Sequence, residues 1–156
     1  MIATEVLKKD HRKVMSLIEE LEAADDQVGT DPTYTETFNH LNELLNRHTR
    51  IEEEVFYPAM KEFDESRDLV REFQKEHKEV VQMLSQLSTM APNVEQFQEV
   101  LSDLRESVEQ HVDEEENELF PMAEELCGQS RLQEMGRRMQ EISEDSRAQA
   151  ATVRRR

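Results

Sequence analysis

The sequence contains one phrase twice. Residues 48–58 read HTRIEEEVFYP, and residues 111–121 read HVDEEENELFP. Each phrase begins with His, has Glu four residues later, and ends in an aromatic residue followed by Pro. Each is preceded by another matched phrase, DHRKV at 10–14 and EHKEV at 76–80. The chain is therefore a tandem of two similar units, each contributing one His and then a His-x3-Glu pair.

Apolar residues recur every three or four positions, which is the spacing of amphipathic helices. The sequence has only 3 Gly and 4 Pro, which leaves little material for β-hairpins, so we predict an all-α fold in a single domain. Helices are expected at about 4–27 and 32–60, from Ser66, from about Asn93 and from Ser130, with turns at 26–32 and 90–93. Asp31 is the expected N-cap of the second helix and Asn93 that of the fourth.

The short connections predict an up-down-up-down four-helix bundle over residues 1–127. Residues 128–156 are expected to add a C-terminal helix, which packs across the bundle or against a second subunit, so the chain is expected to be a monomer or a homodimer. From about Ser143 onward we expect a flexible basic tail.

The net charge of −17 argues against nucleic acid and anionic membranes as partners. No apolar run approaches the length of a membrane span, and the N-terminus lacks the apolar segment of a signal peptide. Cys127 is the single cysteine, which excludes an internal disulfide and suits a reducing compartment. We therefore expect a cytoplasmic protein, in which Cys127 is a small residue near a helix end.

Four histidines fall on the inward stripes of the predicted helices, at about one level of the bundle. They are His11, His48, His77 and His111. Glu52 and Glu115 share the inward faces of His48 and His111, because residues four apart lie on the same side of a helix. A buried carboxylate is costly unless another group compensates its charge. The neighbouring acids Glu53, Glu54, Glu114 and Glu116 are expected to point outward.

Four imidazoles and two carboxylates form a nitrogen and oxygen donor set that suits iron, manganese or zinc. Two carboxylates can bridge two metal ions and offset part of their charge. The alternative is a set of core histidines bonded to backbone carbonyls, which the doubled pattern makes the weaker interpretation. His40 lacks a carboxylate four residues later, and we interpret it as a surface residue.

The two phrases, each preceded by a helix containing DH or EH, resemble the hemerythrin-like, or HHE cation-binding, domain. The resemblance covers residues 1–127 and implies a four-helix bundle that holds a non-heme di-iron site with an oxo or hydroxo bridge. The implied terminal ligands are His11, His48, His77 and His111, and the implied bridging ligands are Glu52 and Glu115. Manganese or zinc is a less favoured alternative to iron.

The sequence departs from the oxygen-carrying hemerythrins in the third helix, where Phe73 stands in the place of a histidine ligand. Two octahedral irons would then keep two open positions rather than one. Tyr57 could fill one of them, but a regular helix would turn it half a turn away from His48. Tyr57 as a ligand therefore requires a distortion near Pro58, and an ordinary packing role is the alternative.

The leading hypothesis is a di-iron protein that binds or reacts with dioxygen, hydrogen peroxide or nitric oxide, with catalase-like or peroxidase-like removal of peroxide as one outcome. Two alternatives remain. One is binding without turnover, in which the protein stores iron or oxygen or senses them through its C-terminal helix. The other is a structural bundle whose histidines bind no metal.

Overall fold

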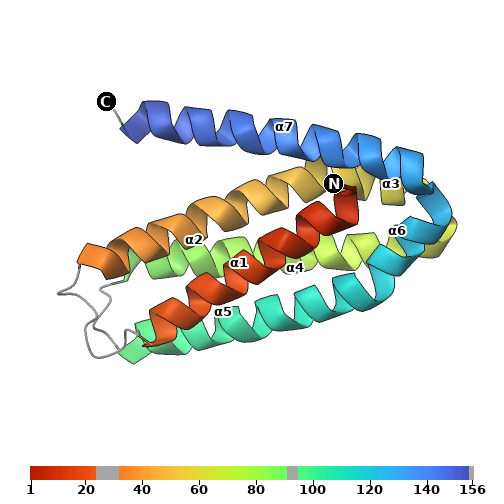
Figure 1. The fold of residues 1–156 in the computed structure, drawn as a ribbon. Helices are drawn as coiled ribbons and strands as arrows, with labels where there is room; N and C mark the ends of the chain where they lie inside the picture. The colour runs from red at the N-terminus through yellow and green to blue at the C-terminus, as the bar shows by residue number, and fades with distance from the viewer. Residues whose placement is uncertain (24–31, 91–94, 155–156) are drawn as a thin grey trace.

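Four long helices lie side by side as an antiparallel bundle, and a fifth long helix lies along its outside (Figure 1). The computed structural model describes residues 1–23, 32–90 and 95–154, and these contain helices and no strand. The bundle consists of α1 (Ala3–Ala23), α2 (Pro32–Ile51), α4 (Asp64–Thr89) and α5 (Glu95–Glu114), and the outer helix is α7 (Gln129–Arg154). The all-α prediction and the bundle architecture are confirmed.

Two of the bundle helices continue through a short π-helical segment. The segment η2 (Glu52–Phe56) joins α2 to α3 (Tyr57–Met60), and η3 (Glu115–Leu119) joins α5 to α6 (Phe120–Cys127). In both places a proline follows, Pro58 or Pro121, which has no N–H to donate to the carbonyl four residues earlier. The wider π turn instead bonds the Tyr57 N–H to the Glu52 carbonyl and the Phe120 N–H to the Glu115 carbonyl.

The apolar core is split into two clusters by a layer of buried polar residues. One cluster lies where η2, α3, η3 and α6 meet α7, and includes Phe56, Phe73 and Phe120. The other lies toward the opposite end of the bundle, and includes Leu21, Leu41 and Phe97. The bundle therefore places a polar layer between two dry regions.

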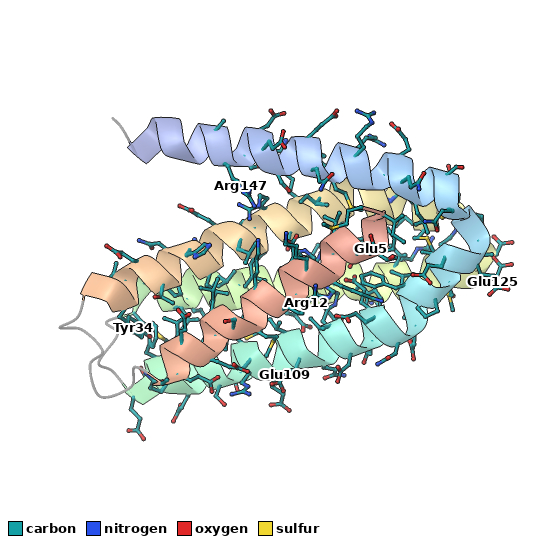
Figure 2. All side chains as sticks on the ribbon, viewed as in Figure 1. Glu5, Arg12, Tyr34, Glu109, Glu125 and Arg147 are labelled. Atoms are coloured by element: carbon teal, nitrogen blue, oxygen red, sulfur yellow. The ribbon has the colours of Figure 1, made fainter. Side chains whose placement is uncertain are left out.

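The outer helix α7 buries one apolar face, formed by Leu132, Met135 and Met139. Gly136 lies on this face, and a Cβ atom there would stand 2.2 Å from the Met1 carbonyl oxygen, so glycine allows the start of the chain to pack against α7. Further along, Arg147 projects toward α2 (Figure 2). The helix extends to Arg154, well past Ser143, where the sequence predicts a tail.

The predictions for single turns and helix ends are confirmed in some places and not in others. The predicted turns, with the caps at Asp31 and Asn93, lie outside the described residues. Ser66 does not begin its helix; α4 begins at Asp64, and the Ser66 hydroxyl donates instead to the Met60 carbonyl at 2.5 Å.

His40 is exposed and Cys127 ends α6, both as predicted. Among the described residues, no helix is long and apolar enough to cross a membrane.

Candidate metal centre

Six polar side chains meet in the layer that divides the core. Each of the four long bundle helices contributes one histidine, and the four are between 3% and 7% exposed: His11 on α1, His48 on α2, His77 on α4 and His111 on α5. Glu52 and Glu115 are fully buried and are the first residues of η2 and η3. The structure thus brings together the six residues that the sequence singles out.

These six residues form two overlapping groups. The first contains His11, His48, Glu52 and Glu115, and the second contains His77, His111, Glu52 and Glu115. Within each group, one potential ligand atom from every residue lies within 4.8 Å of the others. Each repeat unit therefore supplies the two histidines of one position, while both positions share the two glutamates. This is the arrangement that two bridged metal ions require.

The two glutamates also link the repeat units to each other. Glu52 Oε1 lies 2.9 Å from His48 Nε2 in its own unit and 3.2 Å from His77 Nε2 in the other. Glu115 lies 3.4 Å from His111 Nε2 through Oε2 and 3.1 Å from His11 Nε2 through Oε1. All four Nε2 atoms therefore face the two carboxylates at the centre.

Several of these central atoms lack a hydrogen bond of good geometry. They are His11 Nε2, His48 Nε2, both oxygens of Glu52, and Glu115 Oε1. His77 Nε2 and His111 Nε2 point at each other across 3.3 Å. A buried polar atom without a partner is costly, and native proteins rarely keep several in one place. Two cations between these donors would give every one of these atoms a ligand bond.

An outer carboxylate holds the far side of each histidine ring. His48 Nδ1 donates to Asp10 at 3.0 Å, and His111 Nδ1 donates to Glu76 at 2.5 Å. His11 Nδ1 donates to Glu116 at 2.8 Å, and His77 Nδ1 donates to Glu53 at 3.2 Å. A proton fixed on Nδ1 leaves Nε2 as the lone-pair nitrogen and sets the angle of the ring, as in known metal sites.

The sequence prediction that Glu53 and Glu116 simply face solvent is wrong. Glu53 also accepts a hydrogen bond from the Gln74 amide at 2.9 Å, so it ties η2 to α4. The signal was present in the repeats: an acid follows each central glutamate, and an acid precedes each first histidine as Asp10 or Glu76. These positions match because the two units are related in space as well as in sequence.

Without metal, the carboxylates favour protonated histidines. Burial by itself lowers the pKa of His48, but Glu52 and Asp10 outweigh it and raise this pKa to about 10. Burial likewise lowers the pKa of His77, which Glu52 and Glu53 raise above its ordinary value. The metal-free site is thus a set of buried ion pairs, and a bound metal ion would replace the central protons.

Tyr57 enters the site because of the π turn. On a regular helix it would lie five residues beyond Glu52 and point away, whereas the extra residue in η2 turns it back toward Glu52's face. Its hydroxyl donates to Glu115 Oε2 at 2.6 Å and lies 3.2 Å from His77 Nε2. Burial, together with the charges of Glu115 and Glu52, raises the pKa of Tyr57 well above its usual value. In the metal-free protein it is therefore a neutral phenol.

Phenylalanines occupy two related positions. Phe120, which corresponds to Tyr57 in the second unit, stacks on the His11 ring at 5.8 Å with an interplanar angle of 2°. Phe73, at the place of the missing histidine, meets the His111 ring edge-on at 4.9 Å. Both fill space beside an imidazole without offering a donor. The two groups consequently differ, because the Tyr57 hydroxyl lies beside His77, whereas the matching Phe120 offers His11 none.

We predict that Glu53→Gln weakens metal binding by about tenfold or more, because the neutral amide is a poorer acceptor for the His77 Nδ1 proton. Competition with a chelator measures the loss. Glu54→Gln is the matched control, since Glu54 is the next residue and pairs with Arg50 on the exposed surface. Equal affinities for the two variants would contradict the role of Glu53.

We also predict opposite effects of pH on the metal-free and metal-loaded proteins. The raised pKa of His48 stabilises the metal-free fold fully below about pH 6.5, and this contribution is lost as the pH rises toward 10. Metal binding needs deprotonated Nε2 atoms, so it strengthens as the pH rises over the same range. Urea unfolding at several pH values, with and without metal, measures both slopes. Parallel slopes would contradict the assignment.

Comparison with known proteins agrees with this geometry. Residues 2–123 match the hemerythrin HHE cation-binding domain family. A crystal structure of a hemerythrin HHE cation binding domain-containing protein from Mycobacterium kansasii superposes with a TM-score of 0.85 and 26% identity, over 99% of this chain and 93% of that one. The likeness includes α7, which lies beyond the family match.

Two curated proteins are similar to this chain over part of their own length. A hemerythrin-like protein of Schizosaccharomyces pombe is 32% identical over 123 residues, which is 78% of this chain and 59% of that protein. A DNA nickase of Nostoc is 31% identical over 116 residues, which is 74% of this chain and 32% of that protein. The aligned regions thus span less than two thirds of either relative. With the family match covering most of its length, the chain belongs to the hemerythrin HHE cation-binding domain family.

Proposed function

We propose that this protein holds two iron ions at the centre of its bundle and uses them to bind or react with small oxidants. The observation that carries the proposal is the pair of overlapping four-residue groups that share both glutamates. The proposed ligands are His11 and His48 for one ion, His77 and His111 for the other, and the bridging Glu52 and Glu115. Manganese or zinc would suit the same donors and is the less favoured choice.

Charge balance supports the presence of two cations. The two bridging carboxylates neutralise part of the metal charge, and the four outer carboxylates lie one imidazole further out. Two histidines and two shared glutamates do not complete six-fold coordination at either ion. Iron at these positions would supply open coordination sites and a change of oxidation state, which zinc lacks. The chain's own residues then determine which molecules reach the site and where protons are held.

The small molecules that we propose bind or react at the centre are dioxygen, hydrogen peroxide and nitric oxide. The proposed catalytic reaction is the removal of peroxide. Tyr57 supports this proposal, because its hydroxyl is a buried proton donor beside Glu115 and His77. The outer carboxylates keep protons on the Nδ1 atoms and away from the centre. The apolar clusters on both sides limit water near the centre, which strengthens the electrostatic contacts inside.

Binding without turnover is the second candidate, and the packing of α7 favours it. Arg50, two residues before Glu52, donates to Ser146 on α7 at 3.1 Å. Met135 and Met139 of α7 belong to the same apolar cluster as Phe56 and Tyr57. A change at the centre could therefore alter how α7 packs, as a sensor requires. Metal-dependent proteolysis within α7, combined with slow peroxide chemistry, would favour sensing.

The nickase activity named for the Nostoc relative is not part of this proposal. The aligned region is 32% of that protein, and the net charge of −17 opposes contact with DNA. We propose small oxidants as partners and no nucleic acid or membrane.

The first test is metal content and an optical spectrum of the protein purified in air, followed by addition of hydrogen peroxide. We expect about two irons per chain, since two groups of ligands share the bridging glutamates. Near-ultraviolet absorption of a bridged ferric pair should change on adding peroxide, with evolution of dioxygen. Glu115→Ala should lose both ions. A protein without bound iron, which also fails to take up iron on reconstitution, would contradict the proposal.

A second test concerns Tyr57, for which we propose a place beside or in the coordination of the ion at His77 and His111. Tyr57→Phe should retain both ions, because the second unit has Phe120 at the matching position, and should slow peroxide consumption by about tenfold or more. Tyr34→Phe is the matched control, since Tyr34 is the other tyrosine and lies in the far apolar cluster. A variant with unchanged peroxide kinetics would exclude this role.

A further inference from the structure

A small cavity lies directly against the four histidine rings. It encloses about 30 Å³ and is completed by aliphatic side chains and Thr49; the aliphatic residues are Val14, Leu45, Val80, Val108 and Val112. A space of this size holds one or two atoms of the second row, and apolar cavities do not favour water. The centre is therefore bordered on one side by room for a single small molecule.

A second, open depression lies on the surface between α2 with η2 and α4. It has a volume of about 530 Å³, and its walls include Glu53, Gln74, Lys78 and Val81. Val81 is 44% exposed, and among the described residues it and Met1 are the large apolar side chains that face solvent to this degree. This surface thus presents an apolar side chain above the seam between two helices.

Two residues line both spaces, Thr49 and His77. His77 is held in place, because Glu53 accepts its Nδ1 proton at 3.2 Å and Tyr57 stacks on its ring at 5.2 Å. The Gln74–Glu53 hydrogen bond closes the seam one turn beyond Thr49. Thr49 is thus the other side chain that borders both the depression and the cavity.

We propose that small ligands reach the metal centre between α2 and α4, past Thr49, and that residue 49 selects them by size and polarity. The proposal rests on the proposed function, since it concerns the oxidants that the centre would receive. The cavity wall offers aliphatic groups and ring edges, so a charged ligand would lose its hydration without compensation. Neutral diatomic molecules such as dioxygen and nitric oxide lose little there. The path thus favours small neutral molecules over anions.

The second repeat unit provides a matched comparison. Val112 follows His111 as Thr49 follows His48, and it lines the cavity but not the surface depression. A large residue at 112 would fill the cavity, whereas one at 49 would obstruct the path. Filling weakens the equilibrium affinity for a ligand, while obstruction slows association and dissociation together. The two substitutions therefore have different kinetic signatures.

The experiment is stopped-flow binding of nitric oxide to the ferrous protein. Thr49→Phe should lower the association and dissociation rate constants by about tenfold each, with little change in affinity. Thr49→Ala should bind at least as fast as the natural protein, and Val112→Phe should mainly weaken affinity. Should Thr49→Phe fail to fold or load iron, judged by circular dichroism and iron content, Thr49→Leu takes its place. Unchanged rates in the bulky variant, or slowing in Val112→Phe alone, would overturn the proposal.

A readout that does not use iron separates failure of the path from failure of the function. In the zinc-loaded protein under dioxygen, paramagnetic relaxation of the Val80 and Val108 methyl groups should exceed that of Val70, which is buried in the other apolar cluster. Relaxation confined to surface methyls would overturn the cavity as a destination. Strong relaxation of the Val80 and Val108 methyl groups, in a protein whose iron-loaded form neither binds nor reacts with oxidants, would support the path and contradict the proposed function.

Discussion

Two carboxylates with no exposure to solvent occupy the middle of a bundle that is otherwise filled with Leu, Val and Phe side chains. Burying one charge without a partner costs several kcal/mol, which is a large share of the stability of a small domain. The other polar residues in this layer compensate the buried charge of these two carboxylates. Four imidazoles face the carboxylates, and four outer carboxylates face the imidazoles, so that charge alternates outward from the centre.

The same alternation determines how the site changes between its two states. Protons on the histidines compensate Glu52 and Glu115 when metal is absent, and cations would do so when metal is present. The backbone need not rearrange, because the ring orientation is set from outside by Asp10, Glu53, Glu76 and Glu116. The site is thus preorganised. Metal ions would compete with protons for the Nε2 atoms of the four histidines, whose positions the bundle already fixes.

Much of this could be predicted from sequence, for a specific physical reason. A histidine on an apolar stripe can be placed by helical periodicity alone, so the inward direction of His11, His48, His77 and His111 followed from counting residues. The outer carboxylates were missed because an acid such as Glu53 looks the same in sequence whether it contacts water or an imidazole. Repetition of that acid in both units was the available signal. Ser66 failed as the start of its helix because a local rule cannot see that Met60, six residues earlier, offers its carbonyl.

The position of Tyr57 could not be predicted from the geometry of a regular α-helix. Its side chain enters the centre because Glu52 begins a π turn, and no periodicity of 3.6 residues includes that extra residue. Pro58 and Pro121 gave a hint, since each removes a backbone donor at the same distance after a central glutamate. Once the register shift is included, each unit places an aromatic ring against the first histidine of the other unit: Tyr57 stacks on His77, and Phe120 stacks on His11. The repeats therefore agree in backbone even where their side chains differ.

The differences between the units gather around one histidine. Tyr57 replaces the phenylalanine of the other unit and contacts His77, and Thr49 replaces its valine where the cavity meets the surface, again beside His77. The symmetric residues hold charge and shape, whereas the asymmetric ones supply the Tyr57 hydroxyl and border the proposed path. If both features serve the proposed reaction, the Tyr57 hydroxyl and the proposed entry past Thr49 both lie beside His77, whereas the matching ring of Phe120 offers His11 no hydroxyl.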